Sequence, residues 1–156
     1  MYRSEKELRT DGEIDRILEE SQVCRLALNG DGYPYIVPMN FGWGESDGGR
    51  RVLFFHSALK GKKIELLRQD GRAAFEVDTD TDLVAADEAC GFTMKYRSVC
   101  GRGRVRFLES EEDKRLALNQ IMKKYSSRAD WEFPSIKLAA AAVFVLEIEE
   151  IRAKKS

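Results

Sequence analysis

At 156 residues the chain has the length of a single domain, 1–156, that can bury a hydrophobic core without disulfides or metals. Its 26 Lys and Arg nearly balance its 27 Asp and Glu, so no global field draws it to nucleic acid or to a membrane surface. No apolar run is long enough to span a bilayer, and residues 1–15 do not resemble a signal peptide, so we expect a soluble, cytoplasmic protein. Three cysteines without CxxC spacing and a single histidine make a disulfide framework or a structural zinc site implausible.

The first half of the chain reads as a short helix followed by strands. Thr10 and Glu13 form a capping-box pattern, and apolar residues at helical spacing follow them. Pro34 and Pro38 fall at the second predicted strand, which we therefore expect to be irregular or at a sheet edge. A polar, glycine-rich connection is expected over 42–50. The predicted strands cover residues 23–28, 35–41, 52–56 and 73–77, and a second helix is predicted over 59–69.

The second half adds one long strand or two short ones over 92–108, with a bulge expected near Gly101 and Gly103. The acidic segment 78–88 lacks a clear period and is predicted to be an exposed loop. Ser110 caps a further helix, a loop is expected over 126–135, and a final strand over 142–151. Six or seven strands, with helices that do not strictly alternate with them, predict an α+β barrel or sandwich rather than a doubly wound sheet.

Two of the cysteines, Cys24 and Cys100, lie in strand-like apolar surroundings. We expect both of them to be inert core residues. Cys90 lies in a loop and is the more reactive candidate.

The most informative segment is FFHSALKGKKIELLRQ at 54–69, where a strand turns into a helix. A helix start offers backbone N–H groups and the positive end of its dipole to an anion. Ser57 adds a hydroxyl, Gly61 lets the backbone approach closely, and Lys62 or Lys63 supplies charge. On this segment alone, a phosphate site and an ordinary solvated helix start are equally good interpretations.

The strand at 36–41 offers a second candidate surface. Prolines keep its backbone groups free for a planar heteroaromatic ligand, Met39 and Phe41 would form an apolar wall, and Asn40 would supply a donor and an acceptor. The alternative is an edge strand in which proline only prevents further pairing. His56 is either a structural residue or a donor and proton carrier, and nothing orders a nucleophile beside it for triad chemistry.

A row of cations follows in the strand KYRSVCGRGRVR at 95–106. Alternation puts Arg102, Arg104 and Arg106 on one face and Arg97 on the other. The simpler interpretation is a solvated face that pairs with carboxylates. An RNA-binding strand platform is the rival, but the paired aromatic motifs of such sheets are lacking, so no nucleic-acid partner is expected.

The order PYIVPMNFGW, LFFHSALKGKKIELL, FEVD and YRSVCGRGRV is similar to that of the pyridoxamine 5'-phosphate oxidase-like flavoproteins, in the branch related to nitroimidazole-resistance (Nim-like) proteins. The resemblance covers nearly the whole chain. It implies a six-stranded antiparallel Greek-key split barrel of the FMN-binding type with flanking helices. It also implies a homodimer that holds FMN at the subunit interface.

By this resemblance, 38–40 would line the isoalloxazine through backbone contacts, 56–58 would follow the ribityl chain and ring edge, and the lysine pair would take the phosphate. The pair 98–99 would flank the flavin, and the loop before the last strand would reach the partner's flavin. With Gly61 of the turn itself, the candidate FMN contacts are Pro38, Met39, Asn40, His56, Ser57, Ala58, Gly61, Lys62, Lys63, Arg97, Ser98, Val99 and Trp131.

The functional hypothesis that follows is a small FMN-dependent oxidoreductase, such as a nitroaromatic or quinone-like reductase with a reduced nicotinamide as donor. His56 is the one candidate catalytic side chain. The alternatives are a non-catalytic flavin- or haem-binding module and a deazaflavin-using reductase. By the resemblance, true pyridoxamine phosphate oxidases hold the substrate phosphate with a C-terminal segment rich in Arg, Trp and His. The residues EIEEIRAKKS at 147–156 do not resemble such a segment, so that reaction is not expected.

Overall fold

The computed structural model describes residues 4–156, and the first three residues of the predicted domain lie outside this range. Its helices are α1 (Asp11–Glu20), α2 (Lys62–Gln69), α3 (Glu111–Ser126) and α4 (Ser135–Ala139), with 3-10 turns η1 (Ser4–Lys6) and η2 (Ala89–Gly91). Its strands are β1 (Glu7–Leu8), β2 (Cys24–Leu28), β3 (Tyr35–Met39), β4 (Gly42–Glu45), β5 (Arg51–Ala58), β6 (Arg72–Val84), β7 (Thr93–Leu108) and β8 (Ala141–Lys155).

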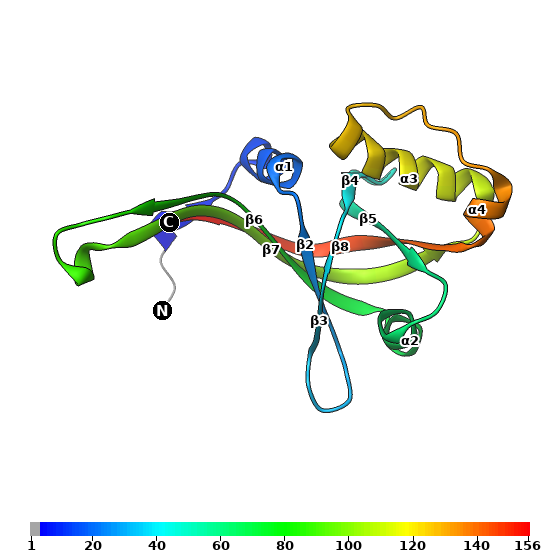
Figure 1. Ribbon diagram of the computed structural model, residues 1–156, viewed down its shortest axis with the longest axis horizontal. Coiled ribbons are helices and arrows are strands. Elements are labelled where there is room, and N and C mark those ends of the chain that lie inside the picture. The colour runs from blue at the N-terminus through cyan, green and yellow to red at the C-terminus, as the bar shows by residue number, and fades with distance from the viewer. Residues whose placement is uncertain (1–3) are drawn as a thin grey trace.

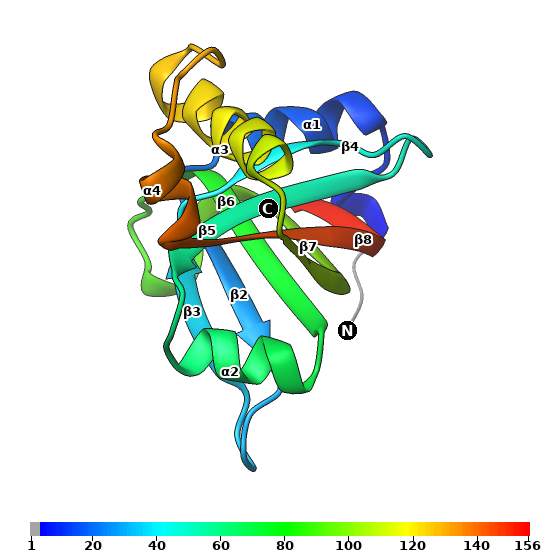
Figure 2. The ribbon, with the colours of Figure 1, turned by 90° about the vertical axis from the view of Figure 1, so that its right-hand side faces the viewer.

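The strands form one antiparallel sheet in the order β3-β2-β6-β7-β8-β5-β4, with β1 paired to β8. The sheet curls so that α2 covers one end of it, while α3 and α4 lie over the outer face of β5 and β8 (Figures 1 and 2). The class is the expected barrel-like α+β fold, but described residues 4–156 form eight strands rather than six. The additions include the two-residue β1 and the short β4, which lies inside the segment predicted to be a connection.

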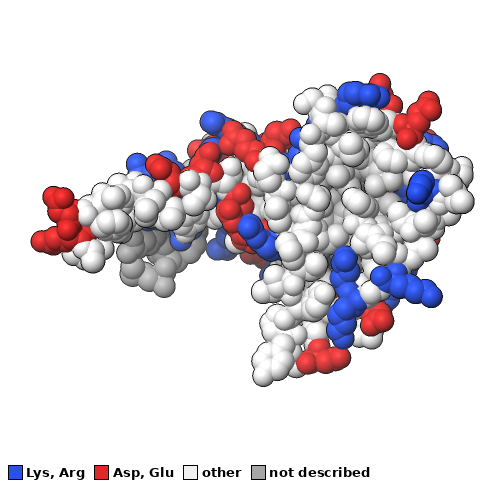
Figure 3. All heavy atoms as spheres, viewed as in Figure 1, with Lys and Arg blue, Asp and Glu red and all other residues white. Residues whose placement is uncertain are grey.

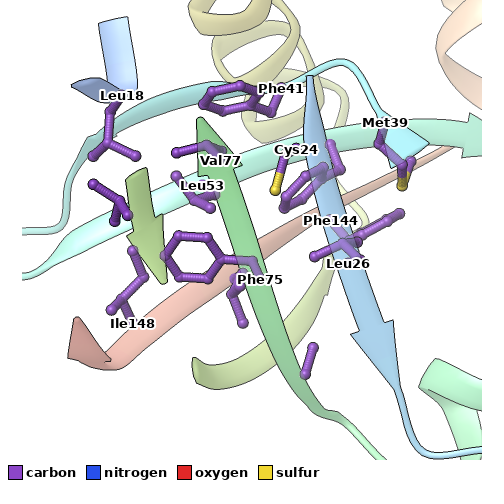
Figure 4. Close-up of a cluster of buried hydrophobic side chains, with 14 of the residues drawn as sticks. Leu18, Cys24, Leu26, Met39, Phe41, Leu53, Phe75, Val77, Phe144 and Ile148 are labelled. Atoms are coloured by element: carbon purple, nitrogen blue, oxygen red, sulfur yellow. The ribbon is translucent and has the colours of Figure 1, made fainter. Parts of the chain in front are cut away.

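The hydrophobic residues form two clusters, one on each face of the sheet. The larger cluster fills the interior of the barrel (Figure 4). Within it, the rings of Phe55 and Phe144 stack with centroids 5.4 Å apart. The smaller one, which includes Val52 and Val143, lies between the sheet and α3. Because side chains alternate along a strand, β5 sends Phe55 into the barrel and turns His56 toward the α3 side.

Local signals place the start of α1 and the main irregularity correctly, whereas α2 begins at Lys62, three residues later than predicted. The Thr10 hydroxyl accepts from the Glu13 N–H while the Glu13 carboxylate accepts from the Thr10 N–H, so the capping box is formed. The β7–β8 register shifts between Arg102 and Gly103, where the bulge was expected. A Cβ at Gly103 would lie 1.9 Å from the Glu147 carbonyl oxygen, so the close approach of the two strands requires glycine here.

Two expectations about the fold, on the segment 78–88 and on Cys100, were wrong. The segment predicted as a loop over 78–88 is largely strand, because β6 continues to Val84 and pairs with β7 in a ribbon that projects from the body (Figure 1). The loop predicted over 126–135 is confirmed, and it leads into the short helix α4, which was not predicted. Cys100 is exposed rather than buried, since it lies on the outer face of β7, whereas Cys24 is fully buried as expected. Within residues 4–156, no helix has both the length and the apolar character needed to cross a membrane.

Candidate functional site

The start of α2 has the properties expected of an anion site. Gly61 occupies the N-cap with φ of 141°, a backbone conformation that L side chains rarely adopt, and no atom lies within 4 Å of the position of an added Cβ. No side chain caps this helix end, so the first-turn N–H groups remain available. Lys62 Nζ lies 3.6 Å from Asp31 Oδ2, and both side chains are well exposed, so this ion pair competes only weakly for the ammonium group.

The preceding strand end carries the rest of the turn. The Ser57 hydroxyl donates to the Ala58 carbonyl at 2.9 Å, so it is turned back onto its own strand, with its lone pairs free to accept. Burial lowers the pKa of His56, which favours a neutral imidazole with one donor and one acceptor nitrogen near neutral pH. Figure 3 shows basic side chains over the α2 end of this face and acidic ones at the tip of the β6–β7 ribbon.

The pairing of β4 with β5 brings the end of β3 near the end of β5, which leads into this turn. Gly42 pairs with Phe54, so Asn40 and His56 each lie two residues beyond the same rung. Asn40 and Pro38 are exposed. The apolar wall expected from Met39 and Phe41 was wrong: their side chains are 8% and 0% exposed because they point into the barrel core, so these two residues can offer a ligand only their backbone.

The residues of β7 do not join this cluster within one subunit. Ser98 pairs with Lys154 at one end of β8, whereas His56 pairs with Val143 near the other end. The eleven residue steps between these rungs correspond to roughly 35 Å of strand.

The three β7 candidates also do not share one face. Val99 is fully buried in the core, so its side chain cannot touch a ligand outside the barrel. The Arg97 guanidinium pairs with Glu20 of α1 at 2.9 Å and with Asp80 of the ribbon, so its charge is already neutralised by carboxylates.

Trp131 is held against its own subunit. Its backbone N–H and carbonyl bond the Asn119 amide at 2.8 and 3.0 Å, and its indole N–H donates to Ser126 Oγ at 3.0 Å. The Arg128 guanidinium stacks 4.0 Å from the ring centroid. The contact with a partner's flavin stays a prediction.

The arginine row on β7 pairs with carboxylates of β8, as the simpler interpretation predicted. Arg102, Arg104 and Arg106 lie 2.9, 3.4 and 3.1 Å from carboxylates at positions 150, 149 and 147, respectively. Each cation has an anionic neighbour, so the row does not form a continuous basic surface for nucleic-acid phosphates.

A cavity of about 230 Å³ opens between α3, α4 and β5, and the sequence alone did not indicate it. Among the candidate residues, only His56 lines it; the other lining residues are Leu118, Ile121, Met122, Phe133, Lys137, Leu138 and Ala141. The helical spacing of Leu118 and Met122 indicated a buried face, but an apolar pattern does not distinguish a filled core from a cavity wall.

Comparison with known proteins places the chain in a family. The family model described as pyridoxamine 5'-phosphate oxidase matches residues 10–155. The structure of a candidate 5-nitroimidazole antibiotic resistance protein from Bacteroides thetaiotaomicron is 28% identical with a TM-score of 0.81, covering 96% of this chain and 86% of that one. A FAD-binding protein from Mesorhizobium loti is 26% identical with a TM-score of 0.65, covering 97% of both chains.

A FAD and heme binding protein from Mycobacterium smegmatis has a TM-score of 0.81 at 22% identity, covering 97% of this chain and 73% of that one, a likeness that shows the fold alone. No curated protein matches the chain. The family match spans nearly all of the sequence, and the expected likeness to the nitroimidazole-resistance branch is confirmed. The chain therefore belongs to the pyridoxamine 5'-phosphate oxidase family and has its split-barrel fold.

Proposed function

We propose that this protein is a flavoprotein that binds FMN and acts as a small flavin-dependent reductase of nitroaromatic or quinone-like compounds, with NADH or NADPH as electron donor. The observation that carries the proposal is the uncapped start of α2, with Gly61, Lys62 and Lys63 directly after the strand end that bears His56. Two relatives above 25% identity support it, because one is described as a candidate nitroimidazole resistance protein and the other as FAD-binding.

The chemistry of the donor set fits a terminal phosphate. A phosphate dianion at the start of α2 would meet free backbone N–H groups, the positive end of the helix dipole and the two ammonium groups of Lys62 and Lys63. The open space at Gly61 lets the anion approach the backbone. When bound, the flavin would supply the hydride and electron transfer, and the protein would supply position and hydrogen bonds.

His56 would act beside the cofactor through its imidazole. Its lowered pKa keeps the ring neutral near pH 7, so it can donate one hydrogen bond while its other nitrogen accepts a proton. We propose it as the one candidate catalytic side chain, positioned by the β5–β8 ladder through its pairing with Val143.

The separation of the candidate residues supports a homodimer with a shared site. Because Ser98 lies roughly 35 Å along the strand from the rung of His56, one flavin of ordinary size cannot touch both within one subunit. A two-fold dimer would bring the β7 residues of one copy to the α2 turn of the other, and would do so twice.

The first experiment is the visible spectrum of the purified protein, followed by anaerobic addition of NADH or NADPH. Flavin bands that bleach on adding a nicotinamide, and return when a nitroaromatic such as 4-nitrobenzyl alcohol is added, are expected. A flavin that is bound but not bleached would favour a carrier, sensor or storage module, and a Soret band would indicate haem at the single histidine. A colourless protein that takes up neither FMN nor FAD would refute the proposal.

A mixing experiment tests the shared site. Two variants are made, Lys62→Ala/Lys63→Ala and Ser98→Trp, each expected to lose FMN as a pure dimer. In co-expressed mixtures, a shared site restores about a quarter of the binding sites, because half of the subunit pairs are mixed and each mixed pair has one intact site. If each site lies within one subunit, mixing would restore no FMN binding, because every subunit still carries one of the two sets of substitutions.

A further inference from the structure

The cavity between α3, α4 and β5 is walled almost entirely by apolar side chains. It has a volume of about 230 Å³, and the only polar side chains that line it are those of His56 and Lys137. His56 enters it from β5, Leu118 and Met122 from α3, and Phe133 from the segment that leads into α4. The helices α3 and α4 lie together over the outer face of the sheet, beside β5 (Figure 2).

Two buried polar residues of α3 hold the roof of this cavity. Lys114, only 8% exposed, donates from Nζ to the carbonyls of Leu138 at 2.9 Å and Ala141 at 3.0 Å, both of which line the cavity. Asn119, also 8% exposed, forms the two bonds that hold Trp131 at the other end of the same segment. Residues 131–141 are thus tied to α3 by hydrogen bonds at both ends of the segment, which fixes the position of the cavity wall between them.

The size of the cavity limits what it can take. An apolar protein cavity of about 150 Å³ holds benzene, whereas sites for drug-sized ligands span about 300–1,000 Å³. A volume of about 230 Å³ therefore suits one substituted ring and is too small for an isoalloxazine or a haem. His56 offers a ring N–H as the hydrogen-bond donor within this apolar wall.

We propose that this cavity binds a small molecule with a single aromatic ring and one acceptor oxygen, with the ring among Leu118, Met122 and Phe133 and the oxygen accepting a hydrogen bond from His56. Its use as the substrate pocket rests on the proposed reductase function, because His56 would then link the bound ring to the flavin. The binding itself requires no flavin, so it can be tested in its own right.

The test is a titration of the full chain, with and without FMN, with 4-nitrobenzyl alcohol. With methyl-labelled methionine, the Met122 resonance is expected to shift and saturate, with a dissociation constant on the order of 0.1–1 mM for a ligand of this size. Met94 on the β6–β7 ribbon should stay unchanged and serves as the internal reference. If the Met122 resonance does not shift at ligand concentrations up to about tenfold above that range, the proposal is overturned.

Matched variants locate the ligand by calorimetry. Leu118→Phe fills the cavity and should weaken binding at least about tenfold, whereas Leu116→Phe, on the same helix but 61% exposed, should leave it unchanged. If Leu118→Phe does not fold, Met122→Phe serves the same purpose. Equal effects at positions 116 and 118 would overturn the proposal.

The role of His56 has its own readout. His56→Ala should weaken 4-nitrobenzyl alcohol about threefold to tenfold, the value of one hydrogen bond, and should leave toluene binding unchanged. An equal loss for both probes would overturn the assigned hydrogen bond. If the protein binds 4-nitrobenzyl alcohol but no flavin, the cavity inference stands and the proposed function is refuted. If it binds flavin but not 4-nitrobenzyl alcohol, the cavity inference is refuted and the flavin-binding part of the proposed function stands.

Discussion

Replacing both lysines at the start of α2 is the most direct test of the phosphate site. In Lys62→Ala/Lys63→Ala, each lost ammonium group removes a charge-assisted hydrogen bond to phosphate, worth about 1.5–3 kcal/mol in a well-ordered site. Lys62 is 48% exposed and must first leave Asp31, an exposed pair worth about 0–1 kcal/mol, so its share falls at the low end. The sum is about 2–4 kcal/mol, or a roughly 30- to 1,000-fold rise in the FMN dissociation constant.

The assay is a titration of FMN fluorescence against protein, at low and at high ionic strength. Added salt should weaken FMN binding by the wild type more than FMN binding by the variant, because salt screens the lysine charges that the variant lacks. Lys60→Ala is the matched control, because Lys60 is exposed in the same turn but precedes Gly61 and the helix. A double variant that binds within twofold of the wild type, or a Lys60→Ala variant that loses as much, would show that the basic turn is only a solvated helix start.

Two further predictions concern stability. Gly103→Ala places a Cβ 1.9 Å from the Glu147 carbonyl oxygen and should lower the free energy of unfolding, measured in urea, by about 2–4 kcal/mol. Gly12→Ala in α1 is the control, because no atom lies within 4 Å of the added Cβ, and it should not lower the free energy of unfolding. Equal effects of the two substitutions would contradict the strand contact at Gly103. Burial lowers the pKa of Lys124 to about 8, so between that value and its ordinary pKa the unfolded chain binds more protons and this residue adds stability as the pH rises. Between pH 7.5 and 9.5 the free energy of unfolding of the wild type should therefore rise by about 1 kcal/mol more than that of Lys124→Met, a value that includes a reduction for the partial exposure of Lys124. An equal rise in both proteins would refute this assignment.

The features that local sequence could predict are those set by a few neighbouring residues. The capping box at Thr10 and the bulge at Gly103 each follow from the preferences of one or two side chains. The ribbon formed by β6 and β7 was missed for a physical reason. Over 78–82 the chain alternates Asp and Thr, and much of this stretch is exposed, so it carries none of the apolar alternation that marks a half-buried strand.

The candidate site was predictable in its parts but not in its assembly. The helix start at Lys62 was visible in the sequence because glycine and adjacent lysines follow a strand. The distance between the rungs of His56 and Ser98 was not, because it depends on the pairing register of β5 and β7 with β8. The cavity beside Met122 was also invisible, since an unfilled volume leaves no residue pattern of its own.

The position of β8 has a consequence for how the chain acquires its structure. Residues 141–155 pair with β7 on one side and β5 on the other, and also with β1 near the start of the described chain. Among the strand pairs of the described residues, the pairings of β8 with β1 and β5 join the positions most distant in sequence. Because their loop-closure entropy must be overcome late, folding should be slow. Until this segment leaves the ribosome, β5 and β7 each lack one neighbouring strand. The nascent chain therefore exposes strand edges on which it can aggregate before β8 pairs with them.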